Sequence, residues 1–436
     1  MEIKDKEQFD KIVVQLIGDN NSFKSEKFEE LEKFVKEALD KSQDSEKALT
    51  LITKGALSFN SSDVHYDIHE DYVQLRFRID GNLANIFTLS KQQYKLTLER
   101  LKYKSDLKLN ITNIPQDGKY RIIDEDKKID VRISTLPVKL GENVVCRILD
   151  SSSSVPSIDD LGFMWASKRQ IEKSIKKKNG MILVTGPTGS GKTTTLYSIL
   201  NSLNNSDKKI ITLEDPIEYE LSGVVQSEVN EKNGYTYVNG LKALMRQDPD
   251  IIMIGEIRDL ETAQIASQAS LTGHLVLSTL HTKSAAETLE RLINIGVPSY
   301  ILSSAIDIII AQRLVRKICP DCIEQVDANP EQNEIIKWMM KDIGIEAVSK
   351  AKTNGFKLYK GAGCEKCGHS GYKGRVGIYE VLSFNDKIRT LIREGASPAE
   401  ILVEARNQDM ILMREDGVLK AMRGKTTLEE LFRVID

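Results

Sequence analysis

The sequence is poor in aromatic side chains, which make up 6% of its 436 residues, and its net charge is close to zero at −3. A protein that binds single-stranded nucleic acid combines a basic groove with aromatic side chains on which the bases stack. This sequence has neither an excess of basic residues nor many aromatic ones, so its composition argues against a nucleic-acid partner. The charged and apolar fractions, 29% and 40%, are ordinary for a globular chain.

Long apolar runs are also missing. The best candidate, residues 300–311, is too short to span a bilayer and contains Asp307. The first ten residues are charged and mixed in sign, without the apolar core of a signal peptide. We therefore expect a cytoplasmic protein that works at a membrane only through partners.

Cysteine is scarce, with five residues in all. Cys146 stands alone in an alternating strand pattern and is expected to be a small core residue. The other four form two C-x-x-C pairs: Cys319, Cys322, Cys364 and Cys367. Each pair can bind one face of a tetrahedral Zn²⁺, and four thiolates would close the coordination sphere of a structural metal. Disulfides are the alternative, but a cytosolic location argues against them.

Glycine is concentrated at one place, residues 186–193, which read Gly-Pro-Thr-Gly-Ser-Gly-Lys-Thr. This is the phosphate-binding loop motif, and it stands between an apolar strand pattern and a helical one, as the motif requires. Lys192 is expected to reach the β- and γ-phosphates of ATP, and the Thr193 hydroxyl to ligate Mg²⁺. A glycine-rich turn that binds nothing would not need this context. The predicted nucleotide-binding residues are Gly186, Pro187, Thr188, Gly189, Ser190, Gly191, Lys192, Thr193, Thr194 and Asp215.

Carboxylates close two further apolar strands. Glu214 and Asp215 follow residues 210–213, and Glu256 follows residues 251–255. An acid delivered beside a phosphate loop can hold Mg²⁺ or its water, or polarise the attacking water. We predict that Glu256 orients the water, with Glu214 and Asp215 in support. The alternative is that Glu214 and Asp215 only cap the following turn.

Two histidines, His274 and His281, bracket the apolar strand 275–280. A lone histidine is usually packed or solvent-exposed. Two of the chain's five at the ends of one strand of this sheet favour γ-phosphate sensing or signalling between subunits.

Arginines in the N-terminal third suggest a further contribution. Arg132 and Arg147 lie on adjacent predicted strands, and Lys119 and Arg121 lie in a predicted loop. A guanidinium delivered across a domain boundary can neutralise charge on a transferred phosphoryl group. The alternative is a strand face of solvated basic residues.

The pattern of elements gives the fold class: an α/β protein with a RecA-like, parallel-sheet P-loop domain and a smaller N-terminal α+β (PAS-like) domain. We predict a helical segment at 1–50, whose apolar positions face its own chain or a membrane-anchored partner. The small domain spans 51–150, and a serine linker spans 151–155. The P-loop domain spans 156–436, with a zinc module at 319–367 and C-terminal helices at 385–436.

Taken in order, the motifs carry a family resemblance. Residues 186–193 look like a Walker A motif, 213–219 like an Asp box, 246–259 like a Walker B motif, and 269–282 like a His box. The combination resembles the secretion ATPases of type II secretion and type IV pilus assembly, over residues 50–436.

The resemblance implies a hexamer that hydrolyses ATP with Mg²⁺, bound peripherally on the inner face of the cytoplasmic membrane. Its subunits would turn an inner-membrane platform protein and add pilin subunits to a filament. The four cysteines resemble the zinc module of the assembly branch. The family's extra N-terminal domain is expected to be reduced to about 50 residues, which leaves the membrane-associated docking protein open. Where the family often has arginine, this chain has Lys119, so Arg132 is the favoured arginine finger.

Two other functions remain open. One is a nucleic-acid translocating or conjugation-type motor on the same core, and the other is a nucleotide switch that does not hydrolyse.

Overall fold

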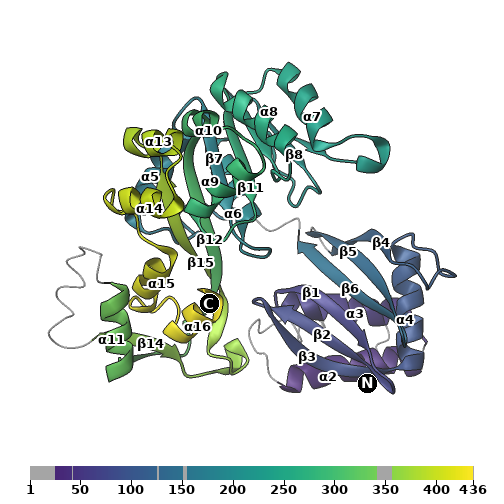
Figure 1. The fold of residues 1–436 in the computed structure, drawn as a ribbon. Helices are drawn as coiled ribbons and strands as arrows, with labels where there is room; N and C mark the ends of the chain where they lie inside the picture. Colours follow the sequence, from purple (N-terminus) through teal and green to yellow (C-terminus); the bar gives the residue numbers. More distant parts are fainter. Residues whose placement is uncertain (1–24, 42, 125–126, 151–154, 341–355, 436) are drawn as a thin grey trace. The chain divides into compact units, whose positions relative to one another are not determined.

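The structure, a computed structural model, describes residues 25–41, 43–124, 127–150, 155–340 and 356–435 (Figure 1). Its internal contacts divide the chain into two compact units, which we describe one at a time. The first comprises residues 1–153, 318–324 and 361–374, and the second comprises 154–317, 325–360 and 375–436. Of the predicted linker, residues 151–154 lie outside the described residues, as do the first 24 residues of the predicted N-terminal segment.

The first unit is built on a six-stranded sheet with strand order β3-β2-β1-β6-β5-β4, in which every pairing is antiparallel. Three helices pack with alternate strand residues into one core, so one face of the sheet is covered. The elements are α2 (Ser25–Asp40), α3 (Ser45–Ser58), β1 (Ser61–Ile68), β2 (Tyr72–Ile79), β3 (Asn82–Ser90), α4 (Lys91–Lys104), β4 (Gln116–Asp124), β5 (Lys127–Val138) and β6 (Gly141–Asp150).

The alternation along β2 explains this sheet. Val73, Leu75 and Phe77 are fully buried, and the residues between them are partly exposed. Asp80 and Gly81 both have positive φ, as a two-residue hairpin turn requires, and they connect β2 to its antiparallel partner β3.

One prediction about this sheet was wrong. We expected Lys119 and Arg121 to lie in a loop, but both lie on β4, which is the strand at one edge of the sheet. Lys119 and Arg121 are exposed, so β4 shows too little apolar alternation to be recognised as a strand.

The second unit is built on a seven-stranded sheet with order β15-β12-β7-β11-β10-β8-β9. The pairings of β12, β7, β11, β10, β8 and β9 are parallel. The strands are β7 (Gly180–Thr185), β8 (Ile210–Glu214), β9 (Val225–Glu228), β10 (Ile251–Ile254), β11 (Leu275–Leu280), β12 (Ile306–Ile318) and β15 (Tyr372–Ser383). A separate two-stranded sheet pairs β13 (Ile323–Asp327) with β14 (Lys357–Gly361).

Helices cover both faces of the seven-stranded sheet, and two hydrophobic clusters share its strands. They are α5 (Trp165–Ile175), α6 (Lys192–Leu203), α7 (Tyr237–Leu244), α8 (Leu260–Leu271), α9 (Ala285–Asn294), α10 (Ser299–Ala305), α11 (Pro330–Met339), α13 (Asp386–Arg393), α14 (Pro398–Arg406), α15 (Met413–Ala421) and α16 (Leu428–Ile435). Every residue of β8, β10 and β11 is buried, which confirms the predicted central strands. The apolar run 300–311 forms α10 and the first half of β12. In the described part of the chain, no helix combines the length and apolarity needed to cross a bilayer.

A buried ion pair supports the first unit. Lys102 Nζ lies 2.7 Å from Glu142 Oε2, and both side chains are almost fully buried. The same ammonium donates to the carbonyl of Ile111 at 2.8 Å, which ties the loop after α4 to the domain.

We predict that replacing Lys102 by Met lowers the stability of this unit by about 3 kcal/mol, because the Glu142 carboxylate is left buried and unpaired. Denaturant unfolding followed by circular dichroism measures the loss. Lys41→Met, which breaks the surface pair with Glu37, is the control and should unfold like the parent. Equal stability of Lys102→Met and the parent would contradict the role of the pair.

Candidate functional site

The phosphate loop connects the end of β7 to the start of α6. Gly186, Gly189 and Gly191 have φ of 151°, 77° and 86°, a region that side chains rarely adopt. At Gly186 an added Cβ would also lie 2.4 Å from the carbonyl oxygen of Gln312. Only glycine fits there, so the loop can turn tightly enough for its N–H groups to converge at the N-terminus of α6.

Lys192 lies at the first position of α6 with its side chain folded over the loop. Its Nζ donates to the carbonyls of Gly186 and Pro187 at 2.9 and 3.1 Å. Burial lowers the pKa of Lys192, and the nearby Glu256 carboxylate acts in the opposite direction. Thr193 and Thr194 are half-buried in the first turn of α6, and residues 187–189 are exposed at the tip of the loop.

Glu256 follows β10 at the same edge of the sheet. The preceding Gly255 stands where the motif usually has aspartate, and an added Cβ there would lie 2.8 Å from the Tyr237 hydroxyl. The Gly255 carbonyl accepts a hydrogen bond from Thr279 Oγ1 at 2.7 Å, and its N–H donates to Leu213 at 2.8 Å. The backbone before Glu256 is therefore fixed to both neighbouring strands.

The Glu256 carboxylate is held from two sides. Arg258 Nε donates to Glu256 Oε1 at 2.7 Å, and His281 Nε2 lies 3.4 Å from Oε2. Arg258 also lies 3.9 Å from a carboxylate oxygen of Asp215. The ends of β8, β10 and β11 thus bring Asp215, Glu256 and His281 into one polar array.

Glu214 differs from Glu256 in its surroundings. It is 3% exposed, and it accepts hydrogen bonds from Thr212 Oγ1 at 2.6 Å, from Gln226 Nε2 at 3.2 Å, and from the Tyr197 hydroxyl. Burial raises the pKa of Glu214, while these donors lower it. A carboxylate so enclosed anchors the segment after β8, and the geometry gives it a supporting place beside Asp215.

A chain of hydroxyls fixes the segment that carries His281. Thr185, the last residue of β7, lies 2.5 Å from Thr282 through their Oγ1 atoms and accepts the Thr282 N–H at 3.0 Å. The Thr282 hydroxyl also forms a hydrogen bond with the hydroxyl of Thr288 in α9, with 2.7 Å between the two Oγ1 atoms. His281 is therefore placed by a contact to the strand that begins the phosphate loop.

His274 is not brought to this array. It precedes β11, whose first residue pairs with Gly180 at the start of β7, whereas the phosphate loop follows the other end. Six residues of strand separate the two edges by about 20 Å. His274 Nδ1 lies 3.0 Å from the carbonyl of Ala269. Phosphate sensing by His274 within its own chain does not fit this placement, which leaves a role between subunits as the remaining hypothesis.

The predicted arginine finger belongs to the first unit. One row of side chains lies on the face of the sheet opposite α2, α3 and α4. It comprises Arg78, Asp63, Arg147, Arg132 and Lys119, which pair directly across β2, β1, β6, β5 and β4. Asp63 accepts from Arg147 Nε at 2.9 Å and lies 3.4 Å from Arg78. The row carries four cations and one anion, which suits an anionic ligand.

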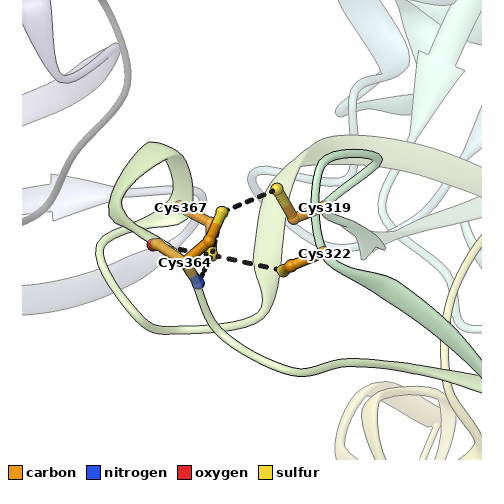
Figure 2. A group of neighbouring side chains, drawn as sticks. All are labelled: Cys319, Cys322, Cys364 and Cys367. Carbon is orange, nitrogen blue, oxygen red and sulfur yellow. Dashed lines mark hydrogen bonds between the residues drawn. The ribbon is translucent and has the colours of Figure 1, made fainter.

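The four cysteines form the second candidate site. Figure 2 shows Cys319 and Cys322 facing Cys364 and Cys367. All four sulfurs lie within 4.8 Å of one another. Cys319 and Cys364 are 3.9 Å apart, and Cys367 lies 3.8 Å from both Cys322 and Cys364. A tetrahedron with metal–sulfur bonds of about 2.3 Å has edges of about 3.8 Å, so the cluster fits zinc. These separations are far longer than a disulfide bond.

The backbone supports this arrangement of thiols. The N–H groups of Cys364 and Gly371 point at Cys367 Sγ at 3.2 and 3.3 Å. Such donors stabilise thiolate, the form that binds metal. The internal contacts of the chain group the two cysteine segments with the first unit. From the sequence, we instead expected them in the P-loop domain, residues 156–436. The limits of the domains remain a prediction.

Several residues of the site escaped the sequence analysis. Arg258, Tyr197 and Gln226 hold the two glutamates. Tyr197 and Gln226 reach Glu214 from other elements, so no sequence pattern marks their contacts, and Arg258 reaches Glu256 within the same segment. Gln312 contacts the phosphate loop, and its signal was visible: it is an amide within the apolar run of β12.

The sequence of this chain matches a known protein family. Residues 38–433 match the family described as Type II/IV secretion system protein. The chain belongs to this family. It is 45% identical over 379 residues to the type II secretion system protein E of Dickeya dadantii, covering 87% of this chain and 73% of that one. It is 45% identical over 380 residues to the type IV pilus assembly ATPase PilB of Pseudomonas aeruginosa, covering 87% and 65%.

Solved structures of other ATPases resemble the structure of this chain. The pilus retraction motor PilT with bound ADP is 27% identical, with a TM-score of 0.57 over 88% of this chain and 95% of PilT. The ATPase DotB of Legionella pneumophila is 22% identical, with a TM-score of 0.64 over 88% and 94%, a likeness of fold. The predicted family and fold class are confirmed.

We predict that the purified chain carries one zinc ion and that Cys322→Ser lowers the zinc content and the melting temperature, because three thiolates leave the coordination incomplete. Elemental analysis and calorimetry measure both. Cys146→Ala is the matched control, since Cys146 is buried in a different core, and it should keep its zinc. Unchanged zinc in Cys322→Ser would contradict the four-thiolate site.

Proposed function

We propose that this chain is an ATP hydrolase and the motor for assembly of a type IV pilus or pseudopilus. The observation that carries the proposal is a phosphate loop with Lys192 and Glu256 gathered at the same end of one parallel sheet. Relatives named as pilus assembly ATPase and type II secretion protein E, which are 45% identical to this chain over 380 and 379 aligned residues, support the same conclusion.

The residues of the site divide the work of hydrolysis. Loop N–H groups and the N-terminus of α6 would bind the β- and γ-phosphates, and Lys192 would exchange its loop carbonyls for phosphate oxygens. The Thr193 hydroxyl would ligate Mg²⁺, which neutralises phosphate charge when bound. Glu256 would accept a proton from the attacking water, while Arg258 and His281 keep its carboxylate aimed.

The mechanical part of the proposal extends the family resemblance. We infer a homohexamer in which hydrolysis swings the first unit against the second and turns an inner-membrane platform protein. Arg132 would meet the phosphates as an arginine finger, from its own chain or a neighbour's. The four-cysteine cluster supports extension of a filament over retraction. The protein would lie on the cytoplasmic side of the membrane, held there by the platform and by a docking protein.

We predict that Glu256→Gln lowers ATP turnover at least 100-fold and leaves ATP affinity within about twofold, because an amide can neither accept the proton nor bind Mg²⁺ as a carboxylate does. Phosphate release and calorimetric titration with Mg·ATP measure the two quantities.

Glu214→Gln is the matched control. It keeps the size of a buried side chain that acts through position, so turnover should fall by less than about tenfold. Equal losses in both variants would assign catalysis to the pair instead of to Glu256. If single-stranded DNA raises the rate of ATP turnover, and added salt abolishes this stimulation, the result would favour the nucleic-acid motor.

We predict that Arg132→Ala lowers turnover about 1000-fold and that Arg132→Lys does not restore it, because an ammonium cannot replace the planar fork of donors. Arg121→Ala is the control, since Arg121 is exposed and bound to Asp130. Steady-state ATPase assays test both variants. Near-parental turnover of Arg132→Ala would leave the row of basic residues as a solvated strand face.

A further inference from the structure

We propose that Gln312, on β12, is a positioning residue that sets the orientation of one peptide group in the phosphate loop. This inference rests on the proposed function, since it concerns how the same loop binds ATP. Gln312 does not belong to the loop motif or to the carboxylate array, and its side chain is 1% exposed.

The amide of Gln312 joins two parts of the nucleotide site. Its Nε2 donates to the carbonyl of Ser190 at 2.7 Å, and its Oε1 accepts from the Thr195 hydroxyl at 2.8 Å. Ser190 is the middle of the loop and Thr195 is on the first turn of α6. Both are buried, so neither bond exchanges readily with water.

The bond to Ser190 matters because of peptide geometry. In a planar trans peptide the carbonyl and the following N–H point in opposite directions. Fixing the Ser190 carbonyl toward Gln312 therefore fixes the Gly191 N–H away from β12. Glycine at 191, with φ of 86°, has no side chain to restrain this peptide, so the restraint comes from Gln312.

The backbone of Gln312 adds a second restraint. Its carbonyl oxygen would lie 2.4 Å from a Cβ at Gly186, so Gln312 lies against the first glycine as well as the loop's middle. β12 can reach both because it pairs in parallel with β7, the strand that leads into the loop. One residue thus limits the movement of the loop at its start and at its middle.

Glutamine suits this position better than other side chains. Ser190 O can only accept and the Thr195 hydroxyl is placed to donate, so the side chain needs a donor and an acceptor on one planar group. Methionine matches its length and supplies neither. Glutamate keeps the acceptor for Thr195 and supplies a donor to Ser190 only when protonated.

The experiment measures affinity and turnover separately in the full chain. The probe is Mg²⁺ with a non-hydrolysable ATP analogue in calorimetry, and kcat comes from phosphate release. We expect Gln312→Met to weaken analogue binding about tenfold and to change kcat less than threefold, because the Gly191 N–H contacts the phosphate before and during reaction.

Gln312→Glu gives a readout that a purely structural role would not move. Relative to the parent, its analogue affinity should rise as the pH falls from 8 to 6, since the protonated acid can donate to Ser190. Thr195→Val, which leaves one end of the amide without its donor, should weaken binding by a smaller factor. It also keeps the test open if Gln312→Met does not fold.

Ile310→Val is the matched control, because Ile310 is a fully buried residue on the same strand whose apolar side chain can neither donate nor accept a hydrogen bond. It should unfold more easily and bind the analogue like the parent. Analogue binding unchanged in Gln312→Met, or weakened equally in Ile310→Val, would overturn the positioning role. A parent chain that neither binds nor hydrolyses ATP would instead overturn the proposed function.

Discussion

The nucleotide site depends on the direction in which a few peptide groups point. Between β7 and α6 the backbone passes through glycine-only conformations at residues 186, 189 and 191, and this turns the loop N–H groups toward one place. A backbone N–H turns only when its whole peptide group turns, so the contacts of that peptide group set its direction. Gln312 contacts the middle of the loop, and Lys192 contacts its first carbonyls. Lys192 belongs to the motif, whereas Gln312 does not, so part of what prepares the loop for an anion lies outside the motif.

The same principle explains the chemistry at the adjoining strand ends. A parallel sheet brings the ends of β8, β10 and β11 to one edge, so a carboxylate, a histidine and an arginine distant in sequence become neighbours. Burial then separates the roles of the two glutamates. Glu214 is enclosed by hydroxyl and amide donors, whereas Glu256 keeps part of its surface open and is held at its oxygens. Chemically identical side chains thus have different surroundings, and the proposed difference in their roles rests on this.

Sequence reasoning was strongest where one short segment determines its own structure. The loop at 186–193 and the spacing of the cysteine pairs depend on local conformation, and both were predictable. It was weakest where structure depends on contacts between elements. β4 was read as a loop because its outward face is charged, and the shielding of Glu214 by Tyr197 and Gln226 joins three separate segments. The length of β11 was the overlooked clue for His274, since six extended residues place its two histidines at opposite edges of the sheet.

The central claim is that the loop ending in Lys192 binds the phosphates of ATP, and one titration tests it most directly. Calorimetry of the full chain with Mg·ATP should show saturable binding that Lys192→Ala loses by at least tenfold, while the melting temperature without nucleotide stays within a few degrees of the parent. Equal affinity in the parent and in Lys192→Ala would show that the nucleotide does not bind at this loop, and the account of the site would fail.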